Sequence, residues 1–371
     1  MENLSLYVHI PFCKSKCTYC NFVSYSGCEE YFKAYLKALK QEIEIRVKEC
    51  KNFVIKTIYI GGGTPSILPL GSISNIIETI KNHFELEKNV EITVEANPNS
   101  LTQEKAMEWK KAGVNRVSIG LQSANNKILK LLNRPHNLKD FKQAISYIKN
   151  ADILNISADM LIGLPKQNWF DIKKTIKTII KQNVKHISAY GLILEPNTKL
   201  FSQVENKELK LPNEDKSVKF YNKTRKLLEK HKYICYEISN FAQQGFESKH
   251  NLNYWARGQF VGFGAGAYSF LNGVHYENTT NLQEYLKKPD NKLNCEQETI
   301  KTAKEEFIML AMRLSKGLDI EKYNIKFKTN FLEEYKNQIE KLQNSRLIII
   351  ENNFVKVLKT ELTNIVIEEF F

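Results

Sequence analysis

The chain has 371 residues, of which 42% are hydrophobic, and its 54 basic and 41 acidic side chains give a formal net charge of +13. No window approaches the ~18 consecutive apolar residues of a membrane-spanning helix, and the first residues lack the basic and apolar segments of a signal peptide. We therefore expect a soluble, cytoplasmic protein with one barrel-sized domain and a smaller one. In that reducing compartment, clustered cysteines favour metal ligation or catalysis over disulfides.

The basic excess does not identify a partner by itself. Lysines are spread along predicted helix faces, as in residues 139–149 and 173–181, and no compact run of Lys and Arg occurs. Nucleic-acid binding usually needs basic side chains clustered on one face. We therefore predict a lysine-rich solvated surface and no nucleic-acid partner.

Short β-rich runs alternate with longer helical patterns over the first two-thirds of the chain. The predicted strands are residues 6–10, 57–60, 90–96, 114–120, 155–162 and 186–192, with a seventh candidate at 234–238. The predicted helices are residues 29–49, 72–83, 102–112, 125–132, 138–149, 169–181 and 214–230. This alternation predicts an α/β fold with a parallel sheet of right-handed βαβ units, which can curl into a full or partial (β/α) barrel.

Chemically distinctive residues follow the predicted strands, at the end where barrels collect their functional groups. The cysteine loop follows the first strand and residues 61–65 (GGGTP) follow the second. Later strands end near Glu95, Gln122, Asp159 and Glu195. The sequence therefore predicts a site at one end of the sheet.

From about residue 301 the pattern changes. Helical patterns at 301–314 and 330–343 precede a predicted hairpin with strands at 346–350 and 354–358. Helices followed by a hairpin are typical of a small α+β winged-helix-like module, which we interpret as a cap on the barrel. The predicted domains are 1–240 (barrel), 241–300 (connecting region) and 301–371 (winged-helix-like domain).

Three cysteines lie in one short loop with the spacing C-x3-C-x2-C: Cys13, Cys17 and Cys20. Three thiolates can hold three irons of a [4Fe–4S] cluster and leave the fourth iron open. The alternative is a structural zinc, which needs four ligands and for which His9 is the nearest fourth candidate. The remaining cysteines are isolated and are predicted to be buried or incidental thiols.

The cysteine spacing followed by Gly-Gly-Gly-Thr-Pro resembles the radical S-adenosylmethionine (SAM) superfamily. That resemblance implies a partial (β/α)6 barrel, a [4Fe–4S] cluster on Cys13, Cys17 and Cys20, and SAM bound to the open iron. In that family an electron from the cluster breaks the S–C5′ bond of SAM. The residues that the resemblance assigns to SAM are Tyr7, Gly62, Gly63, Thr64, Glu95, Gln122, Arg134 and Asp159.

The resemblance covers nearly the whole chain. Segments such as "LYVHIPFCKSKCTYCNF", "VEANP", "RVSIGLQS", "LNRPH" and "DMLIGLP" resemble the anaerobic coproporphyrinogen III oxidase group. Within that group, "HNLNYW" and "GFGAGAYS" resemble its heme chaperone branch. Phe22 stands where the oxidases have a further cysteine, only twelve residues precede Cys13, and no counterpart of a second SAM site is found.

The HNLNYW segment supplies the heme-binding candidates His250, Asn251, Tyr254 and Trp255. A neutral imidazole can ligate heme iron, a neighbouring amide can orient it, and aromatic rings offer apolar faces to a porphyrin. The alternative is a loop histidine beside packed aromatic side chains.

Three functions follow as hypotheses. The first is a heme chaperone that binds the cluster, SAM and heme and transfers heme to an acceptor protein. Its expected partners are heme or a related tetrapyrrole, the heme-acceptor protein (a membrane-associated one included) and an electron donor. The second is an oxygen-independent coproporphyrinogen III oxidase that forms protoporphyrinogen IX by oxidative decarboxylation. The third is a radical SAM enzyme acting on RNA, suggested only by the positive charge and the C-terminal module. Whether the chain is an enzyme stays open at this stage.

Overall fold

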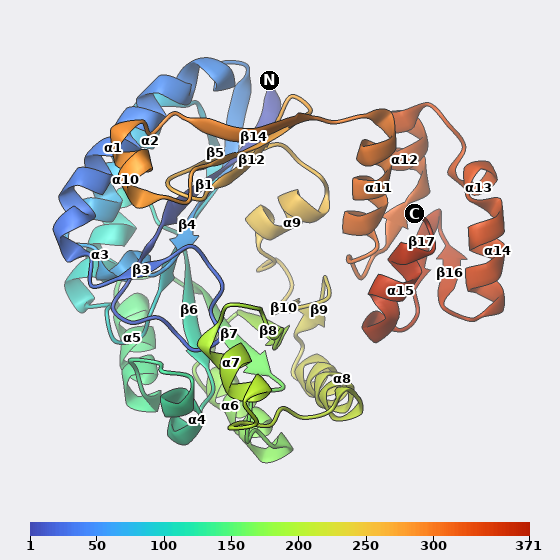
Figure 1. Cartoon of the computed structure of the whole chain (residues 1–371), viewed down its shortest axis with the longest axis horizontal. Coiled ribbons are helices and arrows are strands. Elements are labelled where there is room, and N and C mark those ends of the chain that lie inside the picture. The colour runs from blue at the N-terminus through green and yellow to red at the C-terminus, as the bar shows by residue number, and fades with distance from the viewer.

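The computed structural model describes residues 1–371. Six parallel strands form the central part of one 12-stranded sheet, which curls into a partial barrel (Figure 1). They are β1 (Glu2–Ile10), β4 (Phe53–Gly62), β5 (Leu86–Ala96), β6 (Arg116–Gln122), β7 (Asn155–Ile162) and β8 (His186–Gly191). The predicted partial (β/α)6 barrel is confirmed.

Helices cover the outer face of these strands (Figure 1). They are α1 (Phe32–Arg46), α2 (Ser72–His83), α3 (Gln103–Ala112), α4 (Asn126–Leu131), α5 (Leu138–Asn150), α6 (Trp169–Lys181) and α8 (Glu214–Lys230), with the short α7 (Lys199–Glu205) after β8. Asn137 and Asn168 begin α5 and α6, and each forms a capping box with the aspartate three residues later. These side chains satisfy backbone N–H groups that a helix start leaves unpaired, so the starts of both helices are locally encoded.

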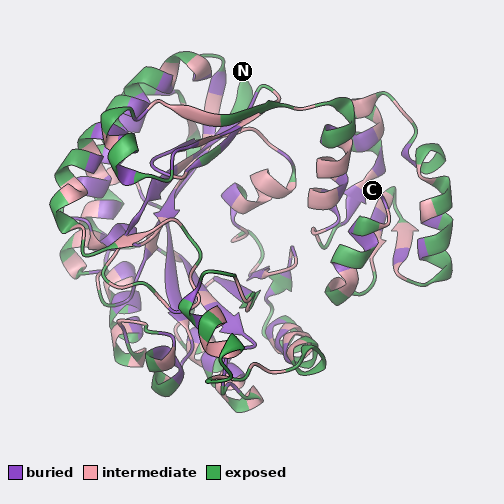
Figure 2. Ribbon diagram, in the orientation of Figure 1, coloured by how far each residue is buried: buried purple, intermediate pink, exposed green.

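The parallel strands alternate in polarity, which is unusual for strands buried on both faces. In β1, Leu4, Leu6 and Val8 are fully buried and belong to the large hydrophobic core beneath the helices. In β6, the alternate residues Arg116, Ser118, Gly120 and Gln122 instead line a cavity inside the barrel. Figure 2 shows the buried residues along the sheet and the exposed ones on the outer helix faces. The barrel interior is therefore polar and leaves room for a ligand.

Further strands extend the sheet at both edges. Next to β1 lie β11 (Phe260–Phe263), β12 (Tyr268–Leu271), β13 (Val274–Asn278) and β14 (Lys292–Gln297); next to β8 lie β10 (Asn240–Ala242) and β9 (Ile234–Cys235). The seventh predicted strand, 234–238, is shorter than expected and pairs antiparallel with β10. The predicted connecting region 241–300, which contains the HNLNYW segment, thus contributes strands to the main sheet.

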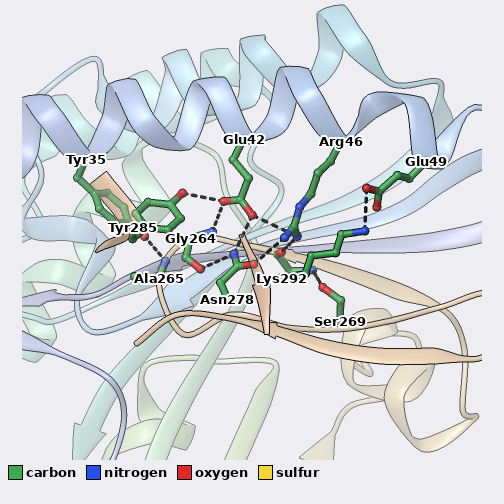
Figure 3. Close-up of polar contacts among 11 residues, drawn as sticks. Tyr35, Glu42, Arg46, Glu49, Gly264, Ala265, Ser269, Asn278, Tyr285 and Lys292 are labelled. Atoms are coloured by element: carbon green, nitrogen blue, oxygen red, sulfur yellow. Dashed lines mark hydrogen bonds and ion pairs between the residues drawn. The ribbon is translucent and has the colours of Figure 1, made fainter. Parts of the chain in front are cut away.

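A buried polar network attaches α1 to this extension (Figure 3). Arg46 Nη1 lies 3.1 Å from Glu42 Oε1, and Arg46 Nη2 donates to Asn278 Oδ1 at 2.6 Å. Glu42 also accepts hydrogen bonds from Tyr285, on α10 (Leu282–Lys287), and from the Gly264 N–H. Each charge is paired and hydrogen-bonded, which is the condition for burying an ion pair without a large desolvation penalty. The network thereby fixes the GFGAGAYS turn beside β1.

The C-terminal domain follows the strand and helix order of a winged helix. Its elements are α11 (Ile300–Ala311), β15 (Leu318–Asp319), α12 (Ile320–Phe327), α13 (Phe331–Glu334), α14 (Lys336–Asn344), β16 (Ile348–Glu351), β17 (Phe354–Val357) and α15 (Thr363–Glu368). The three strands pair in the order β15-β17-β16, and the domain has a hydrophobic core of its own, separate from the barrel core. The predicted α+β module is confirmed.

None of the helices combines the length and the apolar character that a membrane crossing requires.

Candidate functional site

A cavity of about 470 Å³ lies at the carboxyl ends of the parallel strands. It is lined by all three loop cysteines and by seven of the eight residues expected to bind SAM: Gly62, Gly63, Thr64, Glu95, Gln122, Arg134 and Asp159. A larger hollow of about 620 Å³ lies on the outside, between α1 and α2, and its lining carries no comparable cluster of reactive side chains. We therefore take the cavity at the strand ends as the site, as the sequence predicts.

The three cysteines are partly buried free thiols on one loop that begins with β2 (Phe12–Cys13). Thr64 Oγ1 donates to Cys13 Sγ at 3.5 Å, and Arg134 Nη1 lies 3.4 Å from Cys17 Sγ. Burial raises the pKa of Cys13 and Cys20, so both are neutral thiols without a metal. A metal must displace these protons, and the nearby guanidinium then stabilises the thiolates.

His9 is not available as a fourth ligand. Its Nδ1 is hydrogen-bonded to the Tyr7 hydroxyl at 2.9 Å, and its Nε2 to the Val23 carbonyl oxygen at 2.8 Å. Three thiols facing one cavity without a fourth protein ligand fit a [4Fe–4S] cluster with an open iron better than a structural zinc.

The glycines after β4 bring backbone close to the cysteine loop. Gly62 has φ +106°, and a Cβ atom there would lie 2.5 Å from the His9 ring. At Gly63 a Cβ atom would lie 2.6 Å from the Phe12 carbonyl oxygen. Side chains are excluded at both positions, so the GGGTP turn presents bare backbone to the cavity.

Glu95 is held between β4 and β5. Its Oε1 accepts from the Tyr59 hydroxyl at 2.7 Å and its Oε2 from the Gly62 N–H at 3.1 Å. Burial raises the pKa of Glu95 to about 7, although the Tyr59 hydrogen bond opposes the shift. A carboxyl group that changes charge near neutral pH therefore faces the cavity.

Asp159 and Gln122 come from the next two strands. Ser118 Oγ lies 3.2 Å and 3.3 Å from the two carboxylate oxygens of Asp159, and burial raises the pKa of this aspartate. Gln122 has φ +63° at a bulge where β6 leaves its register with β7. Arg134 Nη2 donates to the Gly120 carbonyl oxygen at 2.9 Å, which fixes the guanidinium beside this bulge.

Tyr7 is the exception among the expected SAM residues, because it does not line the cavity. Its hydroxyl bonds to His9, and its ring centroid lies 6.2 Å from that of Tyr59. Its place in the structure is behind the cavity wall.

The HNLNYW segment forms α9 (Lys249–Trp255), which contacts both β4 and α11 (Figure 1). His250 is only 1% exposed. Its Nδ1 bonds to Thr57 Oγ1 at 2.7 Å and its Nε2 to the Tyr254 hydroxyl at 3.0 Å, while its ring stacks on Tyr59 at 5.0 Å. Burial and the nearby Arg116 lower the pKa of His250 to about 3, so the ring is neutral.

This placement resembles the alternative of a histidine beside packed aromatic side chains, although His250 lies on a helix and not on a loop. Both ring nitrogens of His250 are engaged, and of the four candidates only Asn251 lines the cavity. His250 is held inside the barrel by polar side chains of the sheet. Thr57 is hydrogen-bonded to the imidazole ring, and Glu91 accepts from the Lys249 and His250 backbone N–H groups at 3.2 Å each. In this conformation His250 is a packing residue, and heme ligation by it is not supported.

Comparison with known proteins bears on the whole chain. The description "Radical SAM superfamily" matches residues 7–179 and "HemN C-terminal domain" matches residues 300–358. The heme chaperone HemW of Lactococcus lactis is 35% identical over 370 residues, which is 99% of this chain and 97% of that protein. The heme chaperone HemW of Bacillus subtilis is 33% identical over 91% of this chain and 88% of its own length. The chain belongs to the HemW family.

The fold of the whole chain also agrees with a solved structure of Escherichia coli coproporphyrinogen III oxidase, HemN. The TM-score is 0.87 at 20% identity, and the match covers 100% of this chain and 90% of that one. At this identity the likeness establishes the fold alone. Membership of the radical SAM superfamily gives the chain a [4Fe–4S] cluster and SAM as cofactors.

Several residues that line the cavity were not predicted from the sequence: Tyr59, Asn97, Arg116, Ser188 and Tyr190. Tyr59, Arg116, Ser188 and Tyr190 lie inside strands, where a polar residue at every second position points into the barrel. That alternation was the available signal. It becomes informative only when the inward face is known to hold a ligand and not an apolar core.

Proposed function

We propose that this chain is a heme chaperone: it binds heme at the mouth of the cysteine-lined cavity and passes it to an acceptor protein in the cytoplasm. The family relationship supports the class of function. The observation that carries the site is an exposed apolar lip on the cavity, formed by Phe22, Tyr190 and Ile193.

In this proposal Cys13, Cys17 and Cys20 hold the cluster. Gly62, Gly63 and Thr64 receive SAM through backbone and hydroxyl groups, and the polar side chains of Glu95, Gln122, Arg134 and Asp159 complete its binding site. Tyr7 acts indirectly, because it orients His9 and packs near Tyr59. When bound, the cluster supplies one-electron reduction of SAM, so SAM cleavage requires an electron donor.

The lip is suited to a flat apolar ligand. Phe22 is 68% exposed, Tyr190 40% and Ile193 72%, although all three lie at one cavity. Exposed apolar side chains gathered beside a concave polar site mark a place where a ligand or partner covers them. Aromatic rings stack on a porphyrin with favourable offset geometry.

Heme titration of the anaerobically reconstituted protein tests this proposal. We expect a saturable Soret change in the wild type and at least tenfold weaker binding in the double variant Phe22→Ser/Ile193→Ser, which removes apolar area from the lip. Phe170→Ser is the control for loss of an exposed aromatic side chain, because Phe170 is 78% exposed but lies on α6 and does not line the cavity. A wild type without saturable binding would refute the heme-binding function.

The porphyrinogen oxidase reaction is the competing outcome. Incubation with reductant, SAM and coproporphyrinogen III yields protoporphyrinogen IX if the chain is that enzyme. We expect no product from protein with a full cluster. Phe22 at the position of the oxidases' further cysteine is the sequence feature behind this expectation.

A further inference from the structure

Arg116 is a buried cation without a bonded partner at the inner end of the cavity. It is the first residue of β6 and is 2% exposed, yet its side chain contributes to the cavity lining. No hydrogen bond or ion pair within the chain reaches its guanidinium, and its Nε is a buried nitrogen with no partner. The remaining buried arginines, Arg46 and Arg257, are both paired with carboxylates.

The groups around Arg116 are bonded elsewhere. Both oxygens of Glu91 accept from the N-terminus of α9, and Asp159 accepts from Ser118. The rings of His250 and His186 are neutral and bonded at both nitrogens; for His186 the partners are Ser157 Oγ at 2.7 Å and the Tyr236 hydroxyl at 2.8 Å. The protein therefore leaves the donors of this guanidinium unused.

Burial opposes the charge of Arg116, but the carboxylate of Glu91 and the other acidic groups nearby together outweigh this and raise the pKa of the guanidinium, so the group lacks hydrogen-bond acceptors rather than a counter-charge. The planar fork of a guanidinium fits the two oxygens of a carboxylate. Resting on the proposed function, we propose that Arg116 binds a propionate carboxylate of the tetrapyrrole, whose ring lies toward Phe22, Tyr190 and Ile193.

SAM also has a carboxylate, but that group belongs at the cysteine end. In radical SAM proteins the open iron takes the amino and carboxylate groups of SAM, and here Arg134 lies beside Cys17 and bonds to Gly120. Arg116 lies four residues before Gly120 on the same strand, about 13 Å away at the usual rise per residue. The comparison of SAM with decarboxylated SAM decides which carboxylate Arg116 binds.

The test compares heme with heme dimethyl ester, which keeps the iron and the ring but lacks the carboxylate charges. We expect the wild type to bind heme about 10- to 100-fold more tightly than the ester, the range for hydrogen bonds to a charged group. Arg116→Gln should bind the two ligands with equal affinity, and Arg116→Lys should keep part of the preference. Lys16→Gln is the control, because it removes the same charge from an exposed side chain at the cavity lining.

Equal binding of heme and its ester by the wild type would overturn the inference without any variant, while leaving the heme-binding function intact. A parallel titration uses SAM and decarboxylated SAM. If Arg116→Gln abolishes the preference for SAM and leaves heme binding unchanged, the carboxylate at Arg116 is that of SAM and the inference is wrong. Cluster content and melting temperature of each variant show that the comparison is made on folded protein. A wild type that binds neither tetrapyrrole overturns the proposed function itself.

Discussion

The cysteine loop and the α9 helix carry the two most distinctive motifs of this chain, and they differ in whether their polar side chains are bonded within the protein. The cysteine loop is partly buried, and its thiols are free and face a cavity. In α9, His250 is fully buried and both of its ring nitrogens are hydrogen-bonded within the protein. A residue that binds a ligand has polar atoms at a cavity that form no hydrogen bond within the protein, whereas the polar atoms of a packing residue are all bonded. Arg116 is of the first kind.

Removing a cluster ligand should have the largest effect. Cys17→Ala leaves two thiolates, so we expect loss of the [4Fe–4S] cluster, measured as iron content and visible absorbance after anaerobic reconstitution. Cys295→Ala is the control, since Cys295 is an exposed free cysteine in β14. A full cluster in Cys17→Ala would show that the loop does not hold it.

Truncation of His250 should destabilise the fold. His250→Ala deletes two buried hydrogen bonds and leaves the Thr57 and Tyr254 hydroxyls without this partner, so we expect the free energy of unfolding to fall by about 2–4 kcal/mol. Chemical denaturation measures this, and Asn251→Ala, at a partly exposed residue of the same helix, should cost less than about 1 kcal/mol. Unchanged stability together with loss of the heme Soret band would contradict the packing role and make His250 a ligand.

The affinity for SAM should depend on pH through Glu95. Its carboxyl group has a pKa of about 7, and only the ionised form accepts hydrogen bonds with both oxygens. SAM affinity should therefore rise about tenfold from pH 6 to pH 8, as the ionised fraction grows. In Glu95→Gln the affinity for SAM should not change over this pH range. If the wild-type affinity does not change with pH, or if the pH dependence is still present in Glu95→Gln, Glu95 is not the group that controls SAM binding.

Ionisation of Glu95 should raise the affinity for SAM but lower the free energy of unfolding. Its folded pKa lies above the ordinary glutamate value, so the folded state holds a proton that the unfolded state has lost between about pH 4.5 and pH 7. The wild type should lose stability relative to Glu95→Gln as pH rises through this window.

The smallest expected effect concerns Thr64. Its hydroxyl donates to Cys13 Sγ and would favour the more negative, reduced cluster. Thr64→Val should lower the cluster's reduction potential by about 40 mV, the equivalent of a hydrogen bond worth about 1 kcal/mol. Potentiometric titration measures this, with Thr79→Val on α2 as the control; a potential that rises or does not move would refute the contact's role.

The fold and the cysteine site were predictable because their signals are local. Strand–helix alternation, the capping asparagines and the residues after each strand lie within short stretches of sequence. The position of α9 was not predictable, because His250 is held by Thr57 and Glu91, far away in the chain. Arg116 was not predicted for a similar reason. Whether an arginine in a strand has a hydrogen-bond partner depends on the side chains of all the other strands that face the barrel interior.

A crystal structure of the cluster-loaded protein with heme tests the central claim most directly. The account predicts the porphyrin against Phe22, Tyr190 and Ile193, with His250 still bonded to Thr57 and Tyr254. Heme iron ligated by His250, with α9 withdrawn from the barrel, would contradict it.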